Sequence, residues 1–160
     1  MIVREMRKED VDAAAEVYGE HIVEWEVETA RHYFKLSLDE KKKMHHFKAL
    51  DYWVAEEGGE VVGVIGLYNF VAWPERVAWL GYFAVKKTFQ HKGIGSALYE
   101  KAEAVARERG VRIMCIFTSG DEEEGGSVEF YSGKGFQAAG RIPDFWGEGD
   151  DQIYLWKRLK

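Results

Sequence analysis

The stretch Gln90-His91-Lys92-Gly93-Ile94-Gly95-Ser96 constrains this chain most, because it leads from an apolar segment into a helical pattern. Two glycines one residue apart, just before a helix begins, let the backbone approach a ligand closely where side chains would block it. A helix start also presents amide N–H groups that lack partners inside the helix, together with the positive end of the helix dipole. The segment therefore predicts a site for an anionic group such as phosphate or pyrophosphate.

Two common nucleotide-binding loops do not match this segment. A P-loop requires Gly-x4-Gly-Lys-Ser/Thr, and the dinucleotide fingerprint requires a third glycine three residues after the second, where this chain has Leu98. What remains is Gln-x-x-Gly-x-Gly, which follows the apolar run Trp79–Val85. This arrangement resembles the GNAT superfamily of acetyl-CoA-dependent N-acetyltransferases, whose signature loop is Gln/Arg-x-x-Gly-x-Gly/Ala after a strand that ends in Ala-Val.

A second stretch, Ser127 to Phe136, resembles the pattern Ala-x-x-Phe/Leu-Tyr-x-x-x-Gly-Phe of the same superfamily. The resemblance covers residues 52–140 well and the flanks only by layout. It implies an α+β fold of three layers: a mixed, mostly antiparallel twisted sheet of about six to seven strands, with about four helices on both faces. It also implies that residues 1–160 form one N-acetyltransferase domain.

Composition narrows the class of partner. A chain of 160 residues is long enough for one compact domain and too short for two ordinary ones. The formal net charge of −6 argues against a broad nucleic-acid-binding surface and is compatible with a cationic acceptor. The single cysteine, Cys115, excludes an internal disulfide and a multi-cysteine zinc site, and no metal is expected.

The chain carries no pattern typical of targeting or membrane insertion. The N-terminus lacks a basic stretch followed by a long apolar run, and no segment reaches the ~20 apolar residues of a membrane span. We therefore expect a cytoplasmic protein that does not enter a membrane. The sequence leaves both a monomer and a homodimer open.

Hydrophobic periodicity predicts the order of the elements. Helical spacing predicts one helix capped by Asp10 and continuing to Val23, an acidic and aromatic connector over residues 24–29, and a second helix over residues 29–48. A helix beginning at Ile94 should end at Gly110. The strand pattern predicts strands at residues 2–6, 52–56, 61–68, 77–85, 111–117, 136–142 and 152–157, with a loop over residues 143–151. Since a helix connects them, strands 77–85 and 111–117 should be parallel.

The resemblance assigns the cofactor contacts. It implies that the backbone of Phe83, Ala84 and Val85 binds the pantetheine arm of acetyl-CoA, where an N–H can stabilise the oxyanion. The loop that would cradle the pyrophosphate comprises Gln90, His91, Lys92, Gly93, Ile94, Gly95 and Ser96. Many members carry a cofactor-binding asparagine about seven residues before the tyrosine, where this chain has Glu124. Asp121 takes that place if the loop carries extra residues.

Catalytic candidates follow from the chemistry of thioester aminolysis. The resemblance makes Tyr131 the general acid that donates a proton to the departing thiolate. An alkylammonium group loses its proton near pH ~10, so a base should deprotonate the amine. The strand-borne glutamate of one branch of the superfamily would align near Trp79 and is absent. Glu26, Glu28 or a water held by Tyr82 are the remaining candidates.

These observations predict transfer of an acetyl group to a primary amine by direct attack in a ternary complex. A covalent acetyl-cysteine is not expected, since Cys115 lies within a strand with no adjacent histidine. The alternative is a non-catalytic CoA-binding sensor or assembly module of the same fold, and a different acyl group also stays open. The acceptor, whether a small amine or a peptide or protein amine, is not identified by the sequence.

Overall fold

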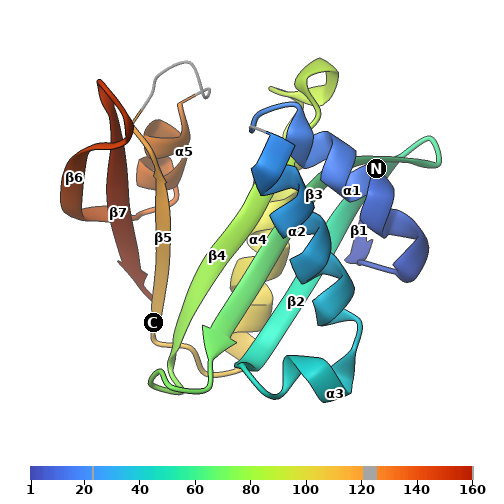
Figure 1. Cartoon of the computed structure of the whole chain (residues 1–160), viewed down its shortest axis with the longest axis horizontal. Coiled ribbons are helices and arrows are strands. Elements are labelled where there is room, and N and C mark those ends of the chain that lie inside the picture. The colour runs from blue at the N-terminus through green and yellow to red at the C-terminus, as the bar shows by residue number, and fades with distance from the viewer. Residues whose placement is uncertain (23, 121–125, 160) are drawn as a thin grey trace.

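The computed structural model describes residues 1–22, 24–120 and 126–159. These residues form one seven-stranded sheet in the order β1-β2-β3-β4-β5-β7-β6 (Figure 1). β4 and β5 are parallel, and every other neighbouring pair is antiparallel. The predicted mixed, mostly antiparallel sheet is therefore confirmed, and so is the parallel pair on either side of the connecting helix.

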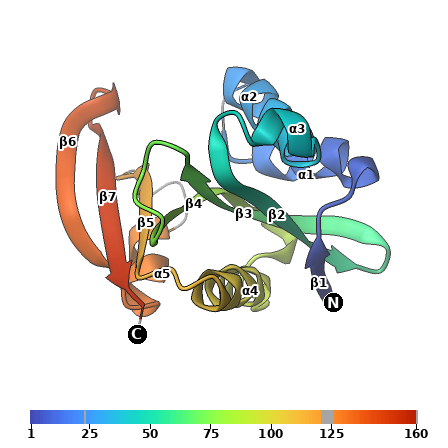
Figure 2. The same ribbon diagram turned by 90° about the horizontal axis from the view of Figure 1, so that it is seen from below.

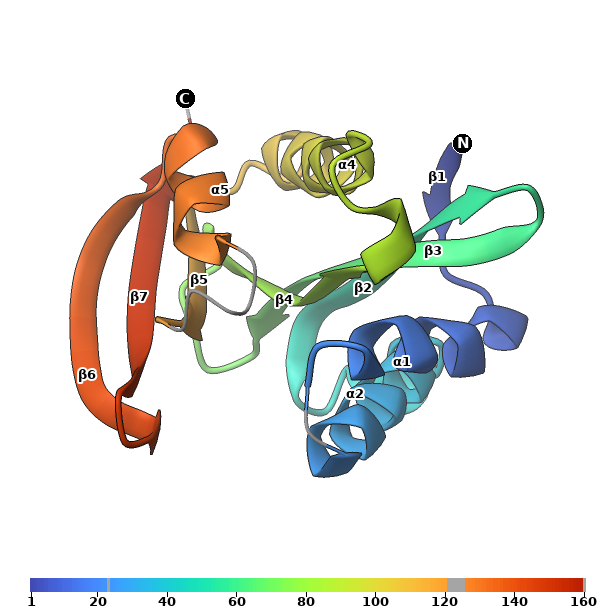
Figure 3. The same cartoon turned by 90° about the horizontal axis from the view of Figure 1, so that it is seen from above.

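The strands agree with the predicted set in number and order. Their bounds are β1 Ile2–Glu5, β2 Phe47–Glu57, β3 Glu60–Phe70, β4 Val77–Val85, β5 Ile113–Ser119, β6 Gln137–Gly147 and β7 Asp150–Arg158. The helices are α1 Val11–Gly19, α2 Glu24–Ser37, α3 Glu40–Lys43, α4 Ile94–Glu108 and α5 Ser127–Gly133. Figures 2 and 3 show α1, α2 and α3 on one face of the sheet and α4 and α5 on the other.

The helix bounds predicted for the N-terminal third were wrong. α1 ends at Gly19, four residues before Val23, and the expected connector 24–29 forms the first turns of α2. The helix predicted over residues 29–48 stops at Ser37, after which the carboxylate of Asp39 accepts the amide N–H of Lys42 and starts the short α3. Phe47 already belongs to β2. It pairs with Phe70 of the neighbouring strand β3, and the centres of the two rings lie 4.6 Å apart.

Asp10 is the N-cap residue of α1, as predicted, but its side chain does not cap the helix. The carboxylate of Asp10 makes no capping bond to that helix and instead accepts the amide of Arg7 and the guanidinium of Arg4. Asp10 is 4% exposed, so this ion pair is held inside the fold rather than on the helix end.

The aromatic and acidic segment 143–151, predicted as a loop, is mostly strand. β6 continues to Gly147 and β7 begins at Asp150, so only residues 148 and 149 form the turn between the two strands. A register shift between Ile142 and Gly147 shows that the pairing with β7 is irregular there. Pro143, Asp144 and two glycines form a pattern typical of turns. The sequence therefore predicted a loop where the structure has a strand that β7 stabilises.

Two apolar clusters cover the two faces of the sheet. One lies under α1 and α2 and includes Phe34, Leu50 and Val54. The other lies under α4 and includes Leu98 and Met114. In the described part of the chain, no helix combines the length and apolar composition that crossing a bilayer would need.

The sheet opens between its two parallel strands. β4 pairs with β5 only through Val77, Ala78 and Trp79, after which the strands separate, as Figure 1 shows. Helix α4 bridges this opening from behind: Glu103 accepts Lys157 Nζ of β7 at 2.7 Å and Arg107 Nε at 3.0 Å, and the hydroxyl of Tyr99 also donates to it. Partial burial opposes ionisation, but these hydrogen bonds lower the pKa of Glu103 to about 2.

Glu103→Gln is expected to lower the free energy of unfolding by about 1–2 kcal/mol at pH 7, because it weakens charge-assisted hydrogen bonds. Since the folded pKa lies below the ordinary 4.5, this stabilisation is complete above pH 4.5 and is lost as pH falls towards 2. Urea unfolding of both proteins from pH 7 to pH 2 measures the difference. Glu100→Gln on the same helix, whose side chain is 70% exposed, is the control and should change stability by less than ~0.5 kcal/mol.

Candidate active site

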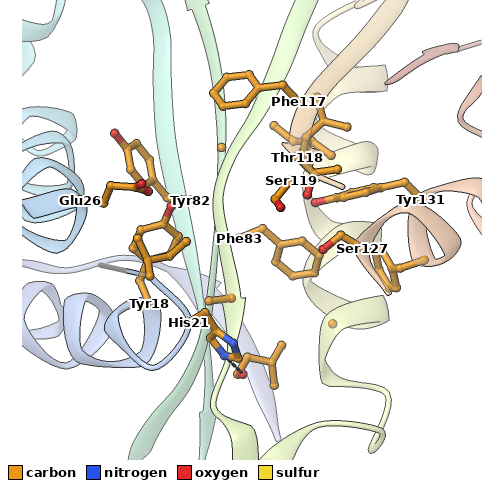
Figure 4. Close-up of a pocket in the computed structure, with 18 of the residues that line it drawn as sticks. Tyr18, His21, Glu26, Tyr82, Phe83, Phe117, Thr118, Ser119, Ser127 and Tyr131 are labelled. Carbon is orange, nitrogen blue, oxygen red and sulfur yellow. Dashed lines mark hydrogen bonds between the residues drawn. The ribbon is translucent and has the colours of Figure 1, made fainter. Parts of the chain in front are cut away.

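A cavity of about 1060 Å³ lies where β4 and β5 separate. β4 forms its back, α1 and α2 border one side, and the end of β5 with α5 borders the other. Figure 4 shows Tyr18, Glu26 and Tyr82 on the first side, facing Thr118, Ser119 and Tyr131 on the second. Residues of the glycine loop line the same cavity.

The glycine loop adopts the conformation that its residues require. Gly93 is the N-cap of α4 with φ of +81°, a left-handed conformation that glycine adopts without a Cβ penalty. A Cβ at Gly93 would meet nothing within 4 Å, so the loop faces open space. At Gly95 a Cβ would lie 3.4 Å from the ring of Phe83, so the helix start approaches β4 closely.

The structure divides the predicted loop residues into two groups. Those that line the cavity are Gln90, His91, Gly93, Gly95 and Ser96. Lys92 and Ile94 are not among the lining residues. The ammonium of Lys92 lies 4.7 Å from the centre of the Phe89 ring and donates to the carbonyl of Thr88, while Ile94 is 4% exposed in the core.

β4 carries a bulge where it borders the cavity. Val64 and Gly66 of β3 pair with Ala84 and Gly81, so β4 has one extra residue, and Tyr82 has φ of +48°. The predicted pantetheine contacts Phe83, Ala84 and Val85 follow this bulge and line the cavity. Nε2 of His21 lies 2.9 Å from the carbonyl of Val85 (Figure 4). A carbonyl only accepts, so His21 donates and fills one of its two acceptor positions.

Tyr131 reaches the cavity from α5. Its side chain is 4% exposed, and its ring packs between those of Phe83 at 6.2 Å and Phe136 at 5.5 Å. Burial, with a smaller contribution from Tyr18 across the cavity, raises the pKa of Tyr131 well above its ordinary value. The phenol therefore stays protonated at neutral pH and retains a proton to donate, although burial makes it a weaker acid.

Two of the three candidates for amine activation line the cavity, and the third does not. Glu26 is half-buried and lines the cavity, and burial raises its pKa. Tyr82 lines the same wall, and its pKa is raised first by burial and then by neighbours that include Glu26. Glu28 is 68% exposed, pairs with Arg31 at 3.2 Å and does not line the cavity.

Other sequence candidates contribute less to this site. Asp121 and Glu124 lie outside the residues that the structure describes. Cys115 lies half-buried in β5, where burial raises its pKa, so its thiol is not activated. Across residues 1–22, 24–120 and 126–159, no cluster of His, Cys, Asp or Glu is arranged to hold a metal ion.

Sequence reasoning missed the aromatic part of the lining. Tyr33 falls within a predicted helix and Tyr52 and Tyr68 fall within predicted strands, and all three line the cavity. The signal that could have found them is the pairing of large rings with glycine. Gly66 lies opposite Tyr52, and a Cβ at Gly81 would lie 2.9 Å from the ring of Tyr68.

Comparison with known proteins agrees with this geometry. The Acetyltransferase (GNAT) family model matches residues 14–136. Among solved structures, a member of the GNAT family from Desulfovibrio desulfuricans superposes with a TM-score of 0.86 at 22% identity, covering 99% of both chains. An aminoglycoside 6'-N-acetyltransferase complexed with coenzyme A gives a TM-score of 0.76 at 16% identity, covering 99% of this chain and 97% of that one.

A curated relative, an N-acetyltransferase of Chlorobaculum tepidum described as uncharacterized, is 37% identical over 68 residues. That match spans 42% of this chain and 42% of the relative, so the chain matches less than half the length of that protein. The family model covers most of the chain, and the chain therefore belongs to the acetyltransferase (GNAT) family. The family expected from the sequence is thereby confirmed.

Gly93→Ala is expected to lower the free energy of unfolding by about 1–2 kcal/mol, because an L-residue is strained at a positive φ. Gly133→Ala is the matched control. Gly133 ends a helix with no atom within 4 Å of its Cβ position, so alanine there should be neutral or stabilising by up to ~1 kcal/mol. Equal urea midpoints for the two variants would contradict the left-handed conformation assigned to Gly93.

Proposed function

We propose that this chain is an acetyl-CoA-dependent N-acetyltransferase that moves an acetyl group to a primary amine by direct attack in a ternary complex. The observation that carries the proposal is one cavity that contains the glycine loop at the start of α4, the bulged edge of β4 and the buried hydroxyl of Tyr131. Acetyl-CoA supplies the activated acyl group as a thioester.

The cofactor half of the cavity fits a diphosphate and an extended arm. The amides that begin α4 point their N–H groups and the positive end of the helix dipole towards an anion, and glycine at 93 and 95 leaves the backbone bare. Past Trp79, β5 no longer covers this edge of β4. Residues Phe83 to Val85 would therefore hold the pantetheine arm through backbone hydrogen bonds.

The acceptor amine must lose a proton before it attacks. Glu26 is the group we assign to this step, because it lines the cavity and its pKa is raised by burial. A carboxylate with a raised pKa is a stronger base and stays ionised above that pKa. Tyr82 beside it would orient the water or amine through its hydroxyl.

The leaving group must gain a proton. Glu26 takes one proton from the ammonium before attack and later releases it to solvent. As the new N–C bond forms and the C–S bond breaks, the sulfur takes the phenolic proton of Tyr131, and the second proton that the nitrogen loses returns to Tyr131 through water. The products are an N-acetylated amine and CoA with a free thiol. A half-buried, unpaired Cys115 is in keeping with the reducing cytoplasm in which we place this enzyme.

Calorimetry with CoA and a thiol-release assay with acetyl-CoA and a panel of amines test the proposal together. It predicts CoA binding and amine-dependent release of free thiol. Binding with no thiol release for any amine would instead identify a CoA-binding sensor or assembly module, and absence of CoA binding would overturn both assignments.

Tyr131→Phe is expected to lower kcat about 100-fold at pH 7 and to leave the KM for acetyl-CoA within threefold, because only the departing thiolate loses its proton donor. A thiol has an ordinary pKa near ~8.5, so the defect should shrink above pH ~9, where the thiolate leaves unprotonated. Tyr154→Phe removes a hydroxyl from a tyrosine outside the lining and serves as control. A kcat within twofold of wild type would exclude Tyr131 as the acid.

Glu26→Gln is expected to lower kcat/KM for the amine about 10- to 100-fold and to abolish the acid limb of its pH profile. Burial raises the pKa of Glu26, so in the wild type that limb should lie above pH 4.5, with activity lost as pH falls through it. Glu28→Gln, about half a helical turn away and solvent-exposed, should keep both the rate and the limb. If both variants behave alike, another group removes the proton.

A further inference from the structure

We propose that the acceptor is an arylalkylamine: a single primary amine on a short chain that ends in one aromatic ring. This inference rests on the proposed function and names the substrate class of the same site. It follows from an aromatic chamber on the α1–α2 side of the cavity, which we define by its lining residues Tyr18, Tyr33, Tyr52, Tyr68 and Tyr82.

The aromatic chamber is assembled from five different elements. Tyr18 comes from α1 and Tyr33 from α2, and the other three come from β2, β3 and β4. The ring of Tyr82 lies 5.3 Å from that of Tyr18, 5.7 Å from that of Tyr33 and 6.2 Å from that of Tyr52. These separations are those of paired aromatic rings, so the chamber presents a continuous wall to a ring of similar size.

Two glycines lie beneath tyrosine rings of the chamber. Gly66 and Gly81 pair with each other across β3 and β4. A Cβ at Gly66 would collide with the ring of Tyr52, and one at Gly81 would lie 2.9 Å from the ring of Tyr68. The centre of the sheet therefore lacks two side chains where the two rings need that space. Glycine in a strand interior is unfavourable, and here it allows the rings of Tyr52 and Tyr68 to lie against the sheet.

Among the described residues that line the cavity, one carboxylate is available for a cation. Among the described residues that line the cavity, the carboxylates are those of Glu20, Glu26 and Asp150. Glu20 accepts the amide of Lys87 at 2.6 Å, and Asp150 accepts the hydroxyl of Ser119. Glu26 has no hydrogen bond to another described residue and lies on the side of Tyr18 and Tyr82 in Figure 4. One carboxylate beside aromatic faces suits one ammonium group, whereas a polyamine needs several.

Exposed aromatic side chains also line the cavity. Trp25, Phe117 and Trp146 are 63%, 41% and 40% exposed, and all three line the cavity from different elements. Single exposed aromatic residues need no explanation, but three around one opening form an apolar patch typical of a ligand-binding groove. They match an aromatic body better than a polar peptide chain.

Thiol release from saturating acetyl-CoA by the full chain tests this substrate class. The probes are 2-phenylethylamine, n-heptylamine, spermidine and a short peptide with a free N-terminus. We expect kcat/KM for 2-phenylethylamine to exceed that for n-heptylamine by about tenfold and that for spermidine or the peptide by about 100-fold. Preference for spermidine, the peptide or n-heptylamine overturns the inference and leaves the acetyltransferase intact. Absence of thiol release with every amine overturns the proposed function and the inference with it.

Neighbouring aromatic residues of β6 provide matched variants. Trp146 lines the cavity, whereas Phe145, 49% exposed and 4.8 Å from it between ring centres, does not. Trp146→Leu should raise the KM for 2-phenylethylamine about tenfold and leave the KM for acetyl-CoA and the rate with n-heptylamine within twofold. Phe145→Leu should change none of these. Tyr33→Leu tests the chamber itself and should act like Trp146→Leu, with folding verified by circular dichroism. Equal effects of the two β6 variants would contradict the assigned wall.

Discussion

The separation of β4 from β5 is the constraint on which the rest of the structure depends. After three paired residues the two parallel strands diverge, and one polar edge of β4 faces a cavity instead of another strand. Unpaired strand edges carry backbone N–H and C=O groups that need partners. In most folds that edge would be a liability. Here it provides a ready template for an extended ligand, while the hydrogen bonds of Glu103 between α4 and β7 hold the two halves of the sheet together behind it.

Glycine divides the cavity into two chemically different halves. On the side of α4, Gly93 and Gly95 expose backbone amides and so favour an anion. On the side of α1 and α2, Gly66 and Gly81 make room for tyrosine rings. These rings favour an apolar ligand that carries a positive charge. The bulge at Tyr82 lies between the halves and allows one strand to serve both. We therefore propose that cofactor binding depends on the start of α4, and substrate selection on the rings over β3 and β4.

The sequence predicted the parts of the fold that depend on local chemistry. The helix start after the glycine loop, the parallel strands around α4 and the positions of seven strands along the chain follow from backbone freedom and apolar period, and each is confirmed. The N-terminal helices were misplaced because the break at Ser37 depends on the cap by Asp39 and on a strand that pairs with β3. Residues 143–147, the second half of β6, were predicted as a loop because their strand conformation depends on the partner β7 rather than on their own residues. In the site, Glu26 could be proposed but not separated from Glu28, since only the rotation of α2 distinguishes them. The aromatic chamber could not be assembled without the register of three strands.

Hydrogen exchange of the backbone amides, measured on the full chain with and without CoA, tests the central claim most directly. The account predicts that CoA slows exchange at two separated places, the start of α4 at residues 93–96 and the bulged end of β4 at residues 82–85, because both line one cavity. Protection of only one of these places, or protection confined to other elements, would contradict the assignment of the cavity between β4 and β5 as the cofactor site.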